Sequence, residues 1–137
     1  MTFVVNFCID APPVAKGRPR FSTRGGFVKT YTPAKTSDWE TVVRAEAVKA
    51  MGASDPLGAP VALSLRFYLP KKAQEAAKLG QTKHTKKPDL DNFAKAVMDA
   101  FNGVLYVDDS QVVDLHVGKY YSDWPRVAVT LMEVIDA

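Results

Sequence analysis

The sequence contains one cysteine, only two histidines and no long apolar run. A single cysteine excludes an intramolecular disulfide, and it excludes the multi-cysteine sites that bind zinc or iron–sulfur clusters. No stretch approaches the roughly 20 apolar residues of a membrane-spanning helix. The first residues also lack the basic segment and the small-residue cleavage site of a secretory signal. We therefore expect a cytoplasmic protein that does not enter a membrane.

The 137 residues are 47% hydrophobic and 24% charged, which is ordinary for a globular protein. At roughly 100–200 residues per domain, this length predicts one domain that spans residues 1–137. A chain of this size buries enough surface to form a core without disulfides or structural metals. The composition therefore excludes a wholly disordered chain.

Charge is unevenly distributed along the chain, although the net charge is only +3. Residues 11–37 hold six basic residues and no acid, and residues 71–87 hold six lysines and one acid. Residues 88–123 reverse the sign, with seven aspartates against two lysines. Two basic segments and one acidic segment share a single domain, and any function must account for this separation.

Hydrophobic periodicity predicts an α+β domain with a mixed sheet of about five strands and two main helices. A capping-box pattern, Ser37 with Glu40, starts the first helix, and Gly52 ends it. The second helix begins at Pro88, and its apolar residues recur at helical spacing as far as Phe101. The predicted strands are residues 3–9, 61–69, 104–107, 111–121 and 126–134.

Two pairs of aspartates bear on the chemistry. Asp89 and Asp91 flank the start of the second helix, and Asp108 and Asp109 follow the predicted strand 104–107. If the fold brought the pairs together, their carboxylates would repel each other unless a cation neutralised them. Because all these ligands are oxygens, the set favours Mg²⁺ or Mn²⁺ over zinc.

Lys95 lies four residues after Asp91, hence on the same face of the predicted helix. An ammonium group beside a carboxylate-bound metal suits a reaction that develops negative charge on a phosphoryl oxygen. A plainer interpretation is also open, in which the aspartates only cap helices and form turns and Asp91 pairs with Lys95. Asp99 continues this line two turns after Asp91, and in either interpretation we expect it to be a solvated residue or a partner of Lys95.

The first basic segment interleaves arginines with aromatic residues and glycines, which suits contact with nucleic-acid phosphates and bases. It can equally be a solvated surface. The residues that we predict to contact DNA come from both basic segments: Lys16, Arg18, Arg20, Arg24, Lys29, Lys86 and Lys87.

The stretch from Asp89 to Val112 resembles the RusA family of Holliday junction resolvases. The family pattern D-L-D-N-x-x-K-x-x-x-D-x-[LF]-N-G, followed by D-D-x-Q-[VI], is matched without gaps. The earlier K-G-R-P-R-F and Y-T-P, at residues 16–21 and 31–33, resemble the phage branch of the family. Because the family is common in prophages, the resemblance also suggests a prophage origin.

The resemblance implies a homodimeric, Mg²⁺-dependent endonuclease, a phosphodiester hydrolase that cuts four-way DNA junctions by paired symmetric nicks in recombination and repair. Mn²⁺ is a possible substitute for Mg²⁺. The catalytic residues of the family fall on Asp89, Asp91, Lys95 and Asp109, and the three aspartates are the implied metal ligands. Asp108 matches a neighbouring acid with a supporting role. Two alternatives stay open, a non-catalytic protein that binds branched DNA and a metal-dependent nuclease for other branched DNA.

Overall fold

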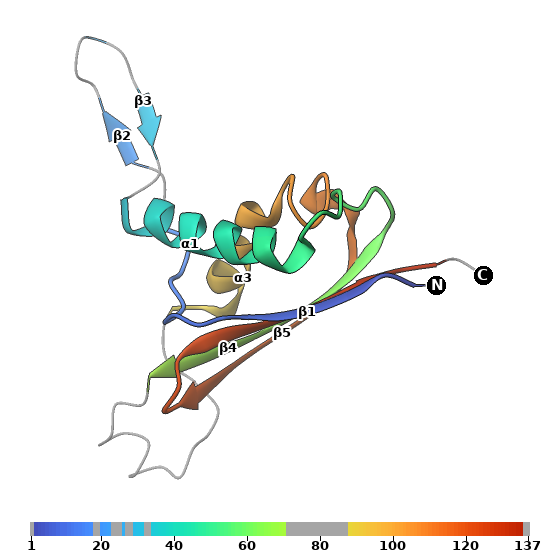
Figure 1. Cartoon of the computed structure of the whole chain (residues 1–137). Helices are drawn as coiled ribbons and strands as arrows, with labels where there is room; N and C mark the ends of the chain where they lie inside the picture. The colour runs from blue at the N-terminus through green and yellow to red at the C-terminus, as the bar shows by residue number, and fades with distance from the viewer. Residues whose placement is uncertain are drawn as a thin grey trace.

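Four strands form one sheet, and two helices cover one of its faces (Figure 1). A computed structural model describes residues 2–17, 26, 34–70 and 88–135, together with the backbone of 20–22 and 29–31. The elements are β1 Val4–Ile9, β2 Arg20–Ser22, β3 Lys29–Tyr31, α1 Ala34–Met51, β4 Val61–Pro70, α3 Leu90–Phe101, the 3₁₀ helix η2 Asp109–Gln111, β5 Val112–Ser122 and β6 Arg126–Glu133. No helix in these ranges is long and apolar enough to cross a membrane.

The sheet is mixed, with strand order β1-β6-β4-β5. Strand β4 runs parallel to β5, whereas the β1–β6 and β4–β6 pairs are antiparallel. The parallel pair requires a crossover connection, and α3 lies within it, on the covered face of the sheet (Figure 1). The predicted α+β class with two main helices is confirmed, with four strands in the main sheet instead of about five.

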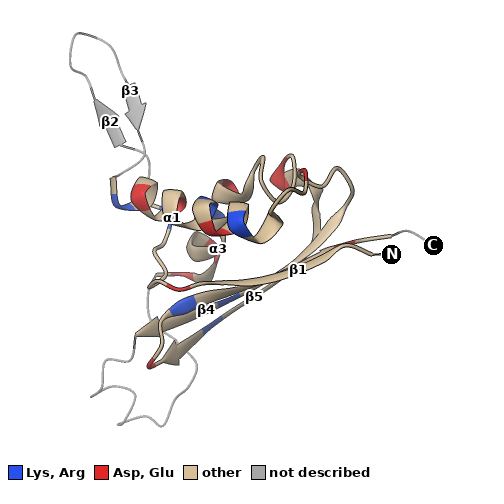
Figure 2. Cartoon of the chain, in the orientation of Figure 1, with Lys and Arg blue, Asp and Glu red and all other residues tan. Residues whose placement is uncertain are grey.

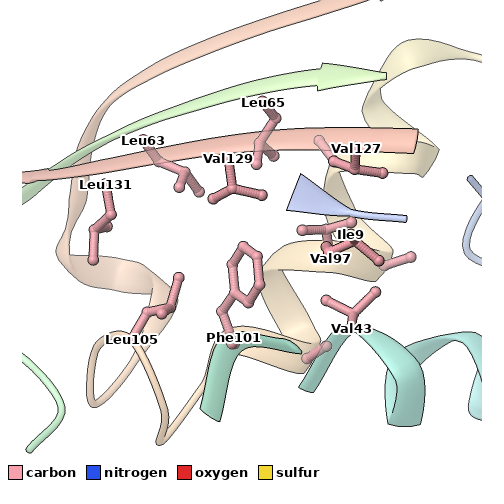
Figure 3. Close-up of a cluster of buried hydrophobic side chains, with 14 of the residues drawn as sticks. Ile9, Val43, Leu63, Leu65, Val97, Phe101, Leu105, Val127, Val129 and Leu131 are labelled. Carbon is pink, nitrogen blue, oxygen red and sulfur yellow. The ribbon is translucent and has the colours of Figure 1, made fainter. Parts of the chain in front are cut away.

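The core lies between the sheet and the two helices. Alternate residues of β4 are buried, as the period of two in its sequence predicts. In Figure 3, Leu63 and Leu65 from β4 point toward Phe101 of α3 and Val43 of α1. Full burial of side chains of this size contributes about 1.5–3 kcal/mol each. This packing fixes α3 against the sheet and leaves its other side for the site.

The prediction of a strand at residues 104–107 is wrong, because this segment forms a turn after α3. Leu105 and Tyr106 are fully buried there, and Tyr106 makes only isolated bridges, to Leu57 and Asn102. Gly103 adopts a φ of 77°, a conformation that favours glycine. The apolar run therefore reflects burial of a turn, which periodicity over four residues cannot distinguish from a strand.

Helix α1 begins at Ala34, three residues before the predicted capping box. Ser37 lies inside the helix, and its carbonyl accepts a hydrogen bond from the Thr41 hydroxyl (3.0 Å). The first turn is instead anchored by Thr36, which is buried and accepts a hydrogen bond from the Gly17 amide (2.9 Å). The hairpin of β2 and β3, in a segment where no strand is predicted, stands away from the sheet near this end of α1 (Figure 1).

Candidate functional site

Helix α3 presents its charged residues on the side that does not face the core. Phe93, Val97 and Phe101 are buried, whereas Asp91 and Lys95 are exposed. The apolar spacing of the sequence therefore determines which way the polar motif faces. Figure 2 shows acidic residues on α3 and in the loop before β5.

The carboxylate of Asp89 is not used to cap α3. Asp89 occupies the N-cap position with an extended backbone, and its side chain makes no capping hydrogen bond. Its backbone carbonyl accepts hydrogen bonds from the amides of Asn92 (3.2 Å) and Phe93 (3.4 Å). The predicted position of Asp89 at the start of the helix is therefore confirmed, and its carboxylate makes no capping hydrogen bond there.

Asp108, in contrast, is a capping residue. Its carboxylate accepts a hydrogen bond from the Ser110 amide (3.0 Å), and its own amide donates to Gln111 Oε1 (2.9 Å). This capping box begins η2. Hydrogen bonds from the Ser110 side chain and backbone hold the pKa of Asp108 below its usual value. Of the second aspartate pair, only Asp109 is left without a capping role.

Gln111 fixes the loop that carries Asp109 to the body of the protein. Its Nε2 donates to the carbonyls of Leu57 (2.7 Å) and Ala59 (2.9 Å), while its Oε1 accepts from Asp108. The amide group of Gln111 therefore joins the backbone of Asp108 to the backbone of residues 57–59, and these hydrogen bonds restrain the loop. Sequence reasoning assigned no role to Gln111, although the family pattern includes this glutamine.

A cavity of about 610 Å³ lies between α3 and β5. Its floor is apolar and its polar residues are charged. The lining residues are Leu90, Asp91, Ala94, Lys95, Met98, Asp99, Asp109, Leu115 and Val117. A concave apolar site with a few convergent charged groups is the usual form of a functional pocket. We refer to it as the α3–β5 pocket.

The α3–β5 pocket brings together three of the four predicted catalytic residues: Asp91, Lys95 and Asp109. Asp89 is not among its lining residues. Within the described residues, no group of three or more acidic, histidine or cysteine side chains could hold a metal ion. Nor does Lys95 form an ion pair with any of them, so the Asp91–Lys95 pair of the plainer interpretation is not formed.

The donor set of the pocket fits Mg²⁺ chemistry. Mg²⁺ is commonly held by only one or two carboxylates and completes its shell with waters and substrate phosphates. Asp91 is exposed and Asp109 is half-buried, and both line the cavity. With Asp89 free of a capping bond, the chain offers oxygen ligands and no thiolate or imidazole within the pocket.

Tyr106 ties the turn after α3 to the helix itself. Its hydroxyl donates a hydrogen bond to the carbonyl of Met98 (2.9 Å). Burial, followed by the nearby charge of Asp109, raises the pKa of Tyr106 well above its usual value, so it stays protonated as a donor. Sequence reasoning missed this role, because a tyrosine in a short apolar run is typical of a strand.

Lys16 is engaged by the helices. Its ammonium lies 2.5 Å from Glu40 of α1 and 3.2 Å from Asp99 of α3. Burial alone would lower the pKa of Lys16, but hydrogen bonds to these two carboxylates outweigh it, and the pKa is raised. Asp99 is therefore neither a free solvated residue nor the partner of Lys95.

The other predicted DNA contacts are not tested by this geometry. Arg18, Arg24, Lys86 and Lys87 lie outside the described residues. Arg20 and Lys29 are described by their backbone only, in β2 and β3 of the hairpin. Contact of any of these residues, or of Lys16, with DNA stays a prediction.

Two comparisons with known proteins bear on this site. The family model for endodeoxyribonuclease RusA matches residues 10–132, which include the whole α3–β5 pocket. The chain is also 41% identical over 138 residues to the uncharacterized protein YqaN of Bacillus subtilis (strain 168), and the match covers 95% of this chain and 96% of YqaN. The resemblance of the D-L-D-N and D-D-x-Q motifs is therefore confirmed, and the chain belongs to the RusA endodeoxyribonuclease family, whose members resolve Holliday junctions with the help of a divalent metal.

Proposed function

We propose that this protein is a Mg²⁺-dependent endonuclease that resolves four-way DNA junctions by paired, symmetric nicks. The observation that carries the proposal is the shared pocket of Asp91, Lys95 and Asp109 in a chain of the RusA family. Mn²⁺ is an alternative metal, because it takes the same oxygen ligands.

The carboxylates of Asp91 and Asp109 would hold the metal, with Asp89 as a third ligand. When bound, Mg²⁺ lowers the pKa of a water molecule and neutralises charge on the scissile phosphate. Lys95 supplies a positive charge to the phosphoryl oxygens, where negative charge develops during hydrolysis. In-line attack of water on the phosphorus atom breaks the P–O3′ bond. The products carry a 5′-phosphate and a 3′-hydroxyl, which a ligase can seal.

The basic segments provide what an acidic pocket lacks, namely attraction for DNA. Uncompensated aspartates repel phosphates, so positive residues around the pocket are needed to bring the backbone close. Residues 11–37 supply six such charges in sequence, and residues 71–87 supply six lysines. We assign the DNA contacts to these two segments, apart from Lys16, whose ammonium is already paired with Glu40 and Asp99.

A homodimer accounts for the pairing of the nicks. A four-way junction is nearly two-fold symmetric, and a two-fold dimer presents two identical pockets to it. Each protomer would then cut one of two equivalent strands.

The test uses a labelled four-way junction and a linear duplex of the same sequence, each with Mg²⁺ and with EDTA. We expect symmetric nicks in the junction alone and only with metal. Junction binding without nicks in any metal would contradict the proposal and favour a non-catalytic binding protein. Equal cleavage of flaps, forks and junctions would instead indicate a nuclease for branched DNA in general.

A further inference from the structure

The charged face of α3 holds two potential partners for Lys95. Asp91 precedes it by four residues and Asp99 follows it by four, so both carboxylates lie on the same stripe of the helix. All three residues line the α3–β5 pocket. A lysine between two such aspartates would ordinarily pair with one of them, and a paired ammonium is less available to a phosphate.

One of these partners is removed by a residue from outside the helix. Lys16 Nζ lies 3.2 Å from Asp99 Oδ2, and Asp99 has no other ion pair within the described residues. If Asp91 binds metal in the reaction, then Asp99 is the carboxylate left to compete for Lys95. The ion pair with Lys16 withdraws Asp99 from this competition.

The backbone around Lys16 is fixed independently of this ion pair. The Lys16 amide donates to the carbonyl of Asn92 in α3 (2.9 Å), and the Gly17 amide donates to the buried Thr36 of α1. Glu40 holds the ammonium from the other side at 2.5 Å. Lys16 is therefore anchored to both helices, with its charge directed at Asp99.

We propose that Lys16 is a positioning residue for the reaction: by pairing with Asp99, it keeps Asp99 from pairing with Lys95, whose ammonium then stays available to the DNA phosphate. This inference rests on the proposed function of the pocket. It differs from the prediction that Lys16 itself contacts DNA.

The first test measures single-turnover cleavage of a four-way junction with saturating enzyme. Lys16→Met removes the charge but keeps most of the aliphatic stem. We expect the cleavage rate to fall about fivefold, as pairing of Lys95 with Asp99 would produce. The junction affinity and its salt dependence should stay unchanged, because no phosphate contact is lost.

A pair of second substitutions separates positioning from simple charge repulsion. Without Lys16, the carboxylates of Glu40 and Asp99 have lost their shared partner and repel each other. If this repulsion alone slowed cleavage, neutralising either carboxylate would restore the rate. Our proposal requires that Lys16→Met with Asp99→Asn recovers the wild-type rate to within about twofold. The double variant Lys16→Met, Glu40→Gln should still cleave slowly, because Glu40 belongs to α1 and is not a neighbour of Lys95. Equal rescue by both, or by neither, would overturn the proposal.

A double-mutant cycle on stability tests the same claim without any activity. Lys95→Met and Asp99→Asn are combined, and the free energy of unfolding is measured in denaturant. We expect no coupling between positions 95 and 99 when Lys16 is present, and a favourable coupling in the Lys16→Met background. Coupling that is the same in both backgrounds would contradict the proposal even if the protein cleaved no junction. If Lys16→Met fails to fold, Lys16→Gln retains a donor for Glu40 and serves in its place.

Discussion

The two aspartate pairs of the motif look alike in sequence but do different work in the fold. Asp89 sits at the N-cap of α3 and makes no side-chain capping bond, and Asp91 is exposed in the first turn. Asp108 is committed to the capping box of η2, and Asp109 faces the α3–β5 pocket. Only one member of the second pair is thus free for chemistry, whereas neither member of the first pair is used as a side-chain cap.

The difference follows from what else holds each element. Helix α3 buries six residues and is stabilised by packing, so its start does not depend on a side-chain cap. The three residues of η2 include none that is buried, so this turn relies on the hydrogen bonds of Asp108 and Gln111. A carboxylate at a helix start is available for a metal when tertiary packing already secures the helix.

The largest effect is expected at Asp91. Asp91→Asn removes a negative charge from the pocket but keeps the size of the side chain. We expect junction cleavage to fall about 1,000-fold, because the metal loses a ligand, while junction binding is preserved. Cleavage assays and gel-shift titrations on one labelled junction measure both. Nicking at the wild-type rate would remove Asp91 from the metal site.

A smaller loss is expected at Lys95, which belongs to the same helix face but not to the metal ligands. Lys95→Met should slow single-turnover cleavage about 100-fold, because the negative charge that develops on the phosphoryl oxygens loses the stabilising ammonium of Lys95. Lys49→Met is the matched control, because Lys49 forms an exposed ion pair with Glu46 away from the pocket. If both variants cleave equally fast, Lys95 has no part in the reaction.

A substitution of Gln111 tests whether Asp109 depends on the hydrogen bonds that hold its loop to the body of the protein. Gln111→Leu removes the hydrogen bonds to Leu57 and Ala59 and leaves their carbonyls unpaired. We expect about 2 kcal/mol less stability in denaturant and a cleavage rate that falls about tenfold, because Asp109 loses its fixed position. Val107→Thr, at an exposed position of the same region, should change neither quantity. An equally active Gln111→Leu would show that the loop needs no such anchor.

The smallest effect is a dependence of stability on acid pH. The pKa of Asp108 is lowered in the folded state, chiefly by hydrogen bonds from Ser110. The cap therefore contributes stability above the unfolded pKa, and this contribution is lost as the pH falls through the folded pKa. Asp108→Asn retains a capping side chain without a charge. We expect this variant to lose less stability than the wild type between pH 7 and pH 3, as measured by thermal unfolding. Identical losses in the two proteins would contradict the assignment.

Local pattern predicted the elements that are long and periodic. The spacing of Phe93, Val97 and Phe101 predicted α3, and the alternation of β4 predicted a strand with one buried face. The segment 104–107 was mistaken for a strand because four apolar residues carry no distinguishable period. The β2–β3 hairpin was missed, because its strands are three residues each.

The candidate site was predicted as a set of residues but not as an arrangement. The motif indicated Asp91, Lys95 and Asp109, which line one pocket. The contact of Lys16 with Asp99 joins residues far apart in the chain, and no local pattern encodes it. The resemblance implies different roles for Asp108 and Asp109, but the physical reason, the hydrogen bond between the Asp108 carboxylate and the Ser110 amide, cannot be predicted from two adjacent identical residues.

The most direct test compares Asp108→Asn with Asp109→Asn on one labelled four-way junction with Mg²⁺. The two substitutions are chemically identical and adjacent in the chain. We predict that Asp109→Asn loses cleavage at least about 100-fold while Asp108→Asn stays within about threefold of the wild type, because only Asp109 faces the pocket. Loss of cleavage in both variants, or wild-type cleavage by Asp109→Asn, would contradict the account.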